Sequence, residues 1–244
     1  MASQKNPKYI LTPTELAEVV GKTMAGVGKA FKDKQTVSLL GRRVGLPSKV
    51  VQDYLIKEGA DFSFKVVAHL NLRGGISKTT ASISLASRAY QYGHKVAILD
   101  LDSQASASLA FNITGENNPV FIDIWQQPEK IKKALVDIED GFSILPSSLN
   151  NGLLDSALAK PIDQKSAVSG ICKELKKMGY TLVIIDCSPS LGAAVVSTIC
   201  AADIISIPVG SDVFSIRGLR LTVSEIKSIC SAFGLKQPEI KILF

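Results

Sequence analysis

The segment at residues 65–79 constrains this chain more than any other, and it reads Lys-Val-Val-Ala-His-Leu-Asn-Leu-Arg-Gly-Gly-Ile-Ser-Lys-Thr. A short apolar run leads into a glycine pair, and Lys78 and Thr79 follow. This order is typical of a phosphate-binding loop, in which a buried strand enters a tight turn that opens a helix with free N–H groups. In such a loop the Lys78 ammonium contacts the terminal phosphates and the Thr79 hydroxyl binds Mg²⁺.

The loop departs from the usual pattern G-x-x-x-x-G-K-[ST], because Leu72 and Ser77 stand at its two glycine positions. It fits a deviant form, [KR]-G-G-x-x-K-[ST], in which Arg73 supplies a second cation ahead of Lys78. A glycine turn with a purely structural role is the alternative for the loop taken alone.

Two other apolar segments end in acidic residues. Residues 98–104 contain Asp100 and Asp102, and residues 183–186 end at Asp186. An aspartate at the end of a strand beside a phosphate loop can orient Mg²⁺, usually through a water molecule, although elsewhere it often only caps the next helix. The loop and both acidic segments, in this order on separate strands, predict a nucleotide site at the carboxyl edge of a sheet.

Apolar runs alternate with helical patterns from Lys65 onward, which predicts a parallel sheet covered by helices on both faces. The expected strands are 66–71, 96–100, 142–146, 182–186, 204–208 and 240–244. The expected helices are 79–92, 151–159, 163–178, 193–201 and 216–233. The last strand looks like the beginning of a buried one, so we expect a longer protein to continue beyond Phe244.

Composition excludes several classes of protein. The 244 residues are 46% hydrophobic and 20% charged, as in a folded globular chain. Four cysteines in apolar surroundings form no C-x-x-C pair, which favours reduced core residues over zinc ligands or disulfides. The most apolar stretch, 191–209, contains Asp203 and Pro208, so we expect no membrane span and a cytoplasmic protein.

The positive charge is concentrated near the N-terminus. The chain carries a net charge of +6, and residues 1–62 hold ten Lys/Arg against six Asp/Glu. Such an excess favours contact with nucleic acid, although a solvated lysine-rich surface has the same composition. We expect residues 1–61 to form a small, mainly helical DNA-binding region and residues 62–244 to form the nucleotide-binding domain.

The N-terminal region also has the spacing of a helix-turn-helix. Leu16, Gly21 and Val27 occupy its core and turn positions, with a second helix expected at about 23–31. A second register is open, because Gly45 and Val51 fit the same spacing and would make 48–55 the recognition helix. A helical packing or dimerisation module is a third reading. We favour the first.

These motifs together resemble the ParA/MinD class of deviant Walker-A ATPases, and most closely the larger plasmid ParA partition proteins. The class has K-G-G-V-[GS]-K-T, D-L-D-P-Q and I-I-D-x-x-P-S-L-G. This chain has R-G-G-I-S-K-T-T at 73–80, D-L-D-S-Q at 100–104 and I-I-D-C-S-P-S-L-G at 184–192. The resemblance covers residues 64–244.

The resemblance implies ATP and Mg²⁺ as cofactors and a role for each matching position. The implied nucleotide-binding residues are Gly74, Gly75, Ile76, Ser77, Lys78, Thr79 and Thr80. Thr79, Asp100 and Asp186 would serve the metal, and Asp102 would position the attacking water. Arg73 replaces the signature lysine, which in this class reaches the nucleotide of a partner subunit. Arginine is not isosteric with an ammonium, but it keeps the positive charge, so we expect dimerisation to persist.

The resemblance also implies DNA contacts. Larger ParA proteins have an N-terminal winged helix with a G-R-R wing, which here corresponds to 41–43, and a basic helix near the C-terminus. The residues expected to contact DNA are Lys22, Thr23, Lys29, Lys32, Arg42, Arg43, Arg217, Arg220 and Lys227. A solvated helix face is the alternative for the last three.

The function implied is that of a slow, Mg²⁺-dependent partition ATPase associated with the nucleoid. ATP would drive homodimerisation and non-specific DNA binding, and a ParB-type adaptor would stimulate hydrolysis. Binding to its own operator is also expected. The alternatives are a repressor tuned by nucleotide and a membrane-cycling ATPase like MinD, which the basic N-terminus disfavours.

Overall fold

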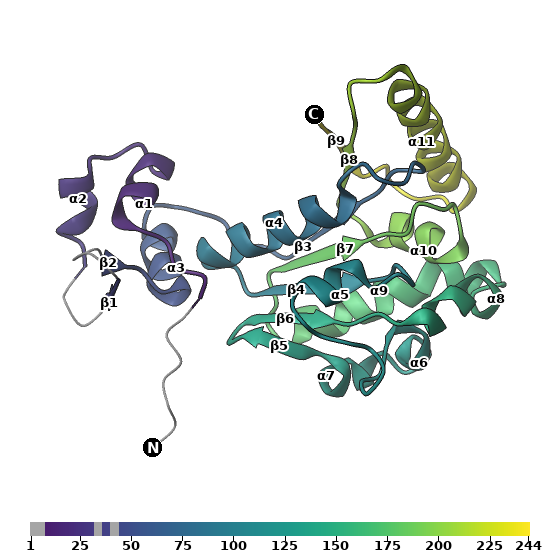
Figure 1. The fold of residues 1–244 in the computed structure, drawn as a ribbon, viewed down its shortest axis with the longest axis horizontal. Coiled ribbons are helices and arrows are strands. Elements are labelled where there is room, and N and C mark those ends of the chain that lie inside the picture. The colour runs from purple at the N-terminus through teal and green to yellow at the C-terminus, as the bar shows by residue number, and fades with distance from the viewer. Residues whose placement is uncertain (1–7, 32–35, 40–43) are drawn as a thin grey trace. The chain divides into compact units, whose positions relative to one another are not determined.

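In the computed structural model, residues 8–31, 36–39 and 44–244 are described. They form two compact units, which Figure 1 shows along the chain. Unit 1 comprises residues 1–63 and 87–95, and unit 2 comprises residues 64–86 and 96–244. No helix of the described residues is both long enough and apolar enough to cross a membrane.

Unit 1 contains three helices and a short strand pair among its described residues. They are α1 (Pro13–Val19), α2 (Met24–Gly28), β1 (Val37–Ser38), β2 (Val44–Gly45) and α3 (Ser48–Lys57). β1 and β2 pair antiparallel. α1 begins with a reciprocal capping box between Thr12 and Glu15, and Pro13 occupies its first turn.

The core of unit 1 is small and apolar. Leu16 from α1, Val27 from α2 and Val51 from α3 are fully buried, and Leu11 and Leu46 join them. α2 is shorter than the predicted helix at 23–31, whereas α3 agrees with the predicted helix that begins at Ser48. Arg42, Arg43 and Lys32 lie outside the described residues.

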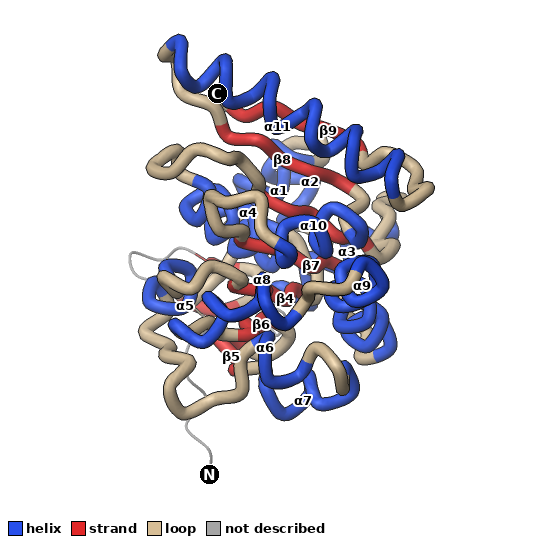
Figure 2. The backbone as a smooth tube through the Cα atoms, turned by 90° about the vertical axis from the view of Figure 1, so that its right-hand side faces the viewer, coloured by secondary structure: helices blue, strands red, loops and turns tan. Residues whose placement is uncertain are grey.

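Unit 2 is built on one seven-stranded sheet with the order β5-β6-β4-β7-β3-β8-β9. Its strands are β3 (Lys65–His69), β4 (Val96–Asp100), β5 (Val136–Glu139), β6 (Phe142–Leu145), β7 (Leu182–Asp186), β8 (Ile204–Pro208) and β9 (Glu239–Leu243). All six predicted strands are present within about two residues of their expected ends. Figure 2 shows them as the red layer between helices.

The sheet is mixed, so the prediction of an entirely parallel sheet is wrong at one edge. β5 and β6 are joined by the tight turn at Gly141 (φ 80°) and run antiparallel, and their register shifts between Asp137 and Glu139. A hairpin of this kind needs no crossover helix, so the alternation of strands and helices did not reveal it. β9 also differs from the expectation of a buried strand, because it is an edge strand with exposed Ile242 and Leu243.

Helices cover both faces of the sheet. They are α4 (Lys78–Gln91), α5 (Ser106–Ala110), α6 (Phe121–Ile124), α7 (Ile131–Ala134), α8 (Leu154–Ala157), α9 (Pro161–Lys177), α10 (Ala193–Ala201) and α11 (Val213–Ala232), with 3-10 turns η3 (Pro128–Lys130) and η4 (Leu149–Leu153). α4 begins in unit 2, and its last residues belong to unit 1. The predicted helix at 151–159 is wrong as a single element, because η4 and the one-turn α8 replace it.

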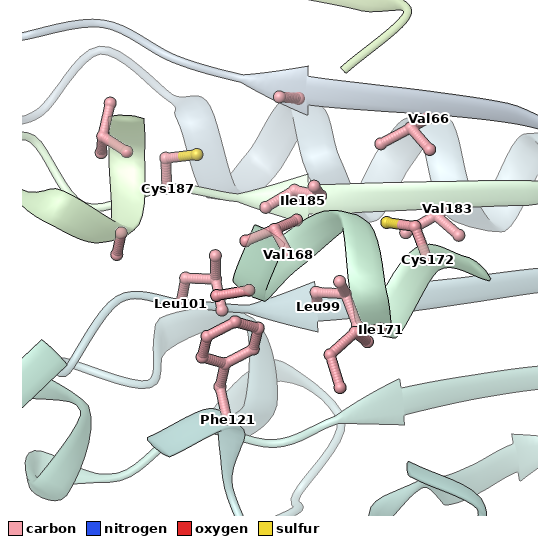
Figure 3. Close-up of a cluster of buried hydrophobic side chains, with 14 of the residues drawn as sticks. Val66, Leu99, Leu101, Phe121, Val168, Ile171, Cys172, Val183, Ile185 and Cys187 are labelled. Carbon is pink, nitrogen blue, oxygen red and sulfur yellow. The ribbon is translucent and has the colours of Figure 1, made fainter. Parts of the chain in front are cut away.

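The main core lies between the sheet and α9–α11. Figure 3 shows Leu99 and Ile185 of the sheet beside Val168 and Ile171 of α9, with Phe121 of α6 closing the cluster. β4 and β7 are buried along their whole length, which explains their continuous apolar sequences. Cys172, Cys187 and Cys230 are buried, as expected of core residues, whereas Cys200 is half-buried. This rigid core fixes the ends of β3, β4 and β7, where the candidate site lies.

Candidate nucleotide-binding site

Three segments meet at the carboxyl edge of the sheet. β3 ends at His69 and leads into the loop before α4, while β4 ends at Asp100 and β7 at Asp186. The strand register pairs Asp186 with His69 on one side and with Asp100 on the other. The sequence analysis therefore identified correctly the three strand ends that meet, because neighbouring parallel strands have their carboxyl ends at the same edge of the sheet.

The loop is held in an unusual backbone conformation. Gly75 and Ser77 have φ angles of 72° and 62°, in the left-handed region. Asn71 braces the loop: its Oδ1 accepts the Arg73 N–H at 3.0 Å, and its Nδ2 donates to the Pro208 carbonyl at 2.8 Å. A serine at positive φ is uncommon and is tolerated only where surrounding contacts fix the chain.

A cavity of about 550 Å³ lies beside this loop. Its lining comprises Arg73, Gly74, Gly75, Ile76, Ser77, Thr80, Ala81, Ser84, Pro208, Val209, Gly210, Asp212, Leu243 and Phe244. The predicted residues 73–77 and Thr80 therefore lie around one space, whereas Lys78 and Thr79 are not part of its lining. The volume of this space is within the range of small-molecule sites.

Lys78 lies at the start of α4 and is 7% exposed. Its Nζ donates a hydrogen bond to the Arg73 carbonyl oxygen at 3.1 Å, so the ammonium group connects the end of the loop to its beginning. Burial lowers the pKa of Lys78, and the nearby Asp186 carboxylate acts in the opposite direction. An ammonium held inside such a loop has further donor capacity to offer a polyanion, and charge-assisted hydrogen bonds of that kind are strong.

Thr79 and Asp186 form the part of the site suited to a cation. The Thr79 hydroxyl donates to Asp186 Oδ2 at 2.7 Å, which leaves the lone pairs of the threonine oxygen available. Asp186 is fully buried, and burial raises the pKa of its carboxyl. Among the described residues no group of three His, Cys, Asp or Glu could hold a metal. The donors fit Mg²⁺, which takes one or two protein oxygens and completes its shell with phosphate and water.

Asp100 faces a different partner. Its Oδ2 accepts the Ser108 N–H at 2.9 Å and the Ser108 hydroxyl at 2.7 Å, both from α5. Burial raises the pKa of Asp100 to about 7. Asp102 is less buried, and its Oδ1 accepts the Gln104 N–H at 3.0 Å. Sequence reasoning missed Ser108, because α5 was not predicted.

Arg73 is engaged within its own chain. Its guanidinium contacts both carboxylate oxygens of Asp212, at 2.6 and 2.7 Å, and donates to the Ser215 hydroxyl at 2.6 Å. Asp212 also accepts the Ser215 N–H, at the beginning of α11. The Ser215 hydroxyl and the Arg73 guanidinium lower the pKa of Asp212. Asp212 was not predicted, since 139 residues separate it from Arg73.

The described residues that were predicted to contact DNA are exposed. Lys22 forms an ion pair with Glu58 at 2.7 Å, and Thr23 caps α2 by accepting the Gly26 N–H. Lys29 lies just after α2. Arg217, Arg220 and Lys227 all lie on α11, at spacings that place them along one side of the helix. The structure thus leaves these side chains on the surfaces of two different units.

The site has a phosphate-binding loop between a buried strand and a helix. Lys-Thr begins that helix, and an acidic residue ends the neighbouring strand. These features are those of a P-loop NTPase. The Arg-Gly-Gly loop carries the deviant pattern on which the resemblance to the ParA/MinD class rests. Residues 64–242 match the family model described as "AAA domain", so the chain belongs to that family.

Known relatives agree with this class. The chain is 27% identical over 165 residues to the chromosome-partitioning ATPase Soj of Thermus thermophilus, covering 66% of this chain and 62% of Soj. Among solved structures, the ATP complex of a Cyanothece McdA variant has a TM-score of 0.66 at 22% identity, covering 72% of this chain and 68% of that one. Cobyrinic acid a,c-diamide synthase of Mycobacterium smegmatis, with an ATP analogue and magnesium, has a TM-score of 0.64 at 24% identity, covering 73% and 70%.

Proposed function

We propose that this protein is an ATPase of the ParA type that partitions or positions DNA by an ATP-controlled dimer cycle. The observation that supports this most directly is the meeting of Lys78, Thr79 and Asp186 at one sheet edge, beside a cavity lined by the Arg-Gly-Gly loop. The partition ATPase Soj among its relatives supports the biological role. The chain spans less than two thirds of the length of Soj.

ATP and Mg²⁺ are the cofactors that the family and the solved neighbours support. The loop N–H groups of residues 74–79 would bind phosphate oxygens, Lys78 would neutralise the terminal phosphates, and Thr80 would help to hold the α-phosphate. Thr79, with Asp186 and Asp100 nearby, would hold Mg²⁺, which supplies charge neutralisation during phosphoryl transfer. Asp102 is proposed to orient the attacking water. With so few groups available to activate water, we expect slow basal turnover.

Arg73 is proposed to reach the nucleotide of a second copy. It is 41% exposed on its side chain, so it is accessible from outside the loop. To act in this way it must exchange Asp212 and Ser215 for phosphate oxygens, and its planar head is suited to that exchange. The triphosphate then joins two protomers, and loss of the γ-phosphate releases them.

DNA binding is proposed for two regions. Residues 1–61 are proposed to be a winged helix-turn-helix domain and 62–244 the ATPase domain. The three helices of unit 1 and the antiparallel pairing of β1 with β2 support this, as do exposed Lys22, Thr23 and Lys29. The second region is the basic side of α11, where Arg217, Arg220 and Lys227 would contact phosphates.

Sedimentation tests the cycle. The protein is centrifuged with ADP, ATP or a slowly hydrolysed ATP analogue, each with and without DNA. We expect dimers and retention on DNA only with the two triphosphates. Lys78→Ala is expected to abolish both, whereas Lys133→Ala, which changes an exposed lysine on α7, is the matched control. Dimerisation indifferent to the nucleotide, or unchanged in Lys78→Ala, would contradict the proposal.

Operator recognition with nucleotide as a tuner is the second candidate. It is supported by the three helices of unit 1 and by the exposed side chains of Lys22, Thr23 and Lys29 at α2, which are expected to contact DNA. The two candidates separate on addition of a ParB-type adaptor bound to its DNA site. A partition ATPase responds with faster hydrolysis, whereas a repressor that only senses nucleotide shows no stimulation.

A further inference from the structure

Two buried side chains behind Asp186 are not explained by the loop motif. Ser82 lies on α4, three residues after Thr79, and His69 is the last residue of β3. They are 0% and 1% exposed. The Ser82 hydroxyl contacts Asp186 Oδ1 at 2.9 Å and His69 Nδ1 at 3.1 Å.

The chemistry of these contacts fixes their direction. An ionised Asp186 only accepts hydrogen bonds, so the single hydrogen of the Ser82 hydroxyl is donated to Oδ1. The contact between Ser82 and His69 then requires the imidazole Nδ1–H to donate to the serine oxygen. The chain of donation runs from His69 to Ser82 to Asp186, while Thr79 donates to the other carboxylate oxygen.

We infer that Ser82 and His69 are positioning residues that orient the Asp186 carboxylate for the metal. This inference rests on the proposed nucleotide function of the same site. One turn of α4 supplies both donors to Asp186, Thr79 to Oδ2 and Ser82 to Oδ1, so the carboxylate plane is fixed relative to the helix that begins at Lys78.

The charge of the two residues suits this task. Ser82 is neutral, and burial lowers the pKa of His69 to about 4, so the imidazole is neutral at physiological pH. Neutral donors stabilise the buried carboxylate without cancelling the negative charge that attracts Mg²⁺. A lysine or arginine in the same place would compete with the cation. Outer donors of this kind orient metal-binding groups, and their loss typically costs about 10- to 100-fold in metal affinity or activity.

The test measures nucleotide affinity with and without Mg²⁺. Binding of a fluorescent ATP analogue is titrated in EDTA and then across a Mg²⁺ series, for wild type, Ser82→Ala, His69→Leu and His69→Asn. We expect Ser82→Ala and His69→Leu to need about tenfold more Mg²⁺ for the half-maximal effect. Affinity in EDTA is expected to change little, because Lys78 and the loop N–H groups are intact. His69→Asn places an amide N–H near the Nδ1 position and is expected to restore most of the Mg²⁺ response.

Ser197→Ala is the matched control, because Ser197 is a buried helical serine of the same unit that accepts the Val168 N–H at 3.0 Å, far along the chain from the loop. It is expected to lose stability but keep the wild-type Mg²⁺ response. A Ser82→Ala protein with the wild-type Mg²⁺ midpoint overturns the inference, as does equal loss of affinity with and without Mg²⁺. A wild-type protein that binds no ATP overturns the proposed function itself, and this inference with it. If His69→Leu does not fold, the Ser82→Ala and His69→Asn results decide.

Discussion

The two units of this protein differ in where their polar side chains lie. Unit 2 buries Asp100, Asp186 and His69 at the ends of its central strands and satisfies them with hydroxyl groups. Unit 1 has leucine and valine side chains at its centre. The ion pairs among its described residues are Lys22 with Glu58, Arg88 with Glu15 and Lys49 with Asp53, and the side chains of all three pairs are partly or largely exposed.

This difference indicates how strictly each unit requires particular residue types at particular positions. Buried polar networks are costly unless every member is satisfied, so the arrangement in unit 2 requires particular residue types at particular positions. An apolar core with a polar surface accepts many sequences. Chemical function in unit 2 can therefore be argued from single residues, whereas in unit 1 it rests on exposed charge and on the spacing of helices.

The largest expected effect on stability comes from truncating one buried leucine in the core of each unit. Leu16→Ala in unit 1 and Leu175→Ala in α9 of unit 2 remove the same atoms from sites that are 0% exposed. Each is expected to cost about 2–5 kcal/mol. In a unit as small as unit 1 this loss is comparable to the whole free energy of unfolding, so Leu16→Ala should unfold unit 1 while basal ATP hydrolysis persists. Hydrogen exchange followed by mass spectrometry, with an ATPase assay, checks this. Parallel loss of protection in both units would contradict the separation.

The pH dependence of stability tests the buried polar network of unit 2. Burial lowers the pKa of His69 from 6.5 to about 4, so between these values the unfolded chain binds a proton that the folded chain does not. Stability contributed by the neutral imidazole is complete above pH 6.5 and decreases as pH falls toward 4. His69→Asn lacks this penalty. Relative to wild type, its free energy of unfolding is expected to improve by up to about 3 kcal/mol between pH 7 and pH 4.

Chemical denaturation at several pH values measures this difference, and taking the difference between the two proteins cancels the contributions of other groups. His94, whose pKa is also lowered by burial, is common to both proteins. A constant difference across pH would show that the pKa of His69 is the same in the folded and unfolded chain, and burial would then not be what keeps the imidazole neutral.

Much of unit 2 could be predicted because its signals are local. The continuous apolar runs indicated β4 and β7, and the loop motif placed Lys78 and Thr79 at the start of a helix. Adjacent parallel strand ends then required Asp100 and Asp186 to be neighbours. These inferences need only the chain's own periodicity and the geometry of parallel sheets.

The remainder depends on contacts between distant residues or on elements too short to have a period. α5, α6 and α7 have five residues or fewer, so no helical repeat reveals them. The contact of Arg73 with Asp212 joins residues that no local pattern connects. The sequence does contain a weak indication of Ser82. A residue three positions after Thr79 on a helix lies on the same side as Thr79, and this spacing was overlooked.

A smaller effect is expected at the beginning of α1, where unit 1 depends on local capping. The Thr12 hydroxyl accepts the Glu15 N–H, and Glu15 accepts the Thr12 N–H at 2.8 Å. Thr12→Ala is expected to cost about 1 kcal/mol, whereas Thr12→Ser should keep most of the cap. Thermal unfolding of unit 1 measures both. Equal stability of Thr12→Ala and wild type would show that Pro13 and the core alone fix the start of α1.

The smallest expected effect concerns Arg73, the residue through which unit 2 is proposed to reach a second copy. Asp212→Asn keeps a side chain that can accept the Ser215 N–H but removes the charge opposite the guanidinium. Both side chains are more than one third exposed, so the ion pair is screened and the effect is modest. We expect the ATP concentration for half-maximal dimerisation to fall about two- to fivefold, because Arg73 is released for phosphate. Sedimentation across an ATP series measures it, with Asp163→Asn in the first turn of α9 as control. A higher requirement for ATP would mean that Asp212 instead holds Arg73 in the orientation that dimerisation needs.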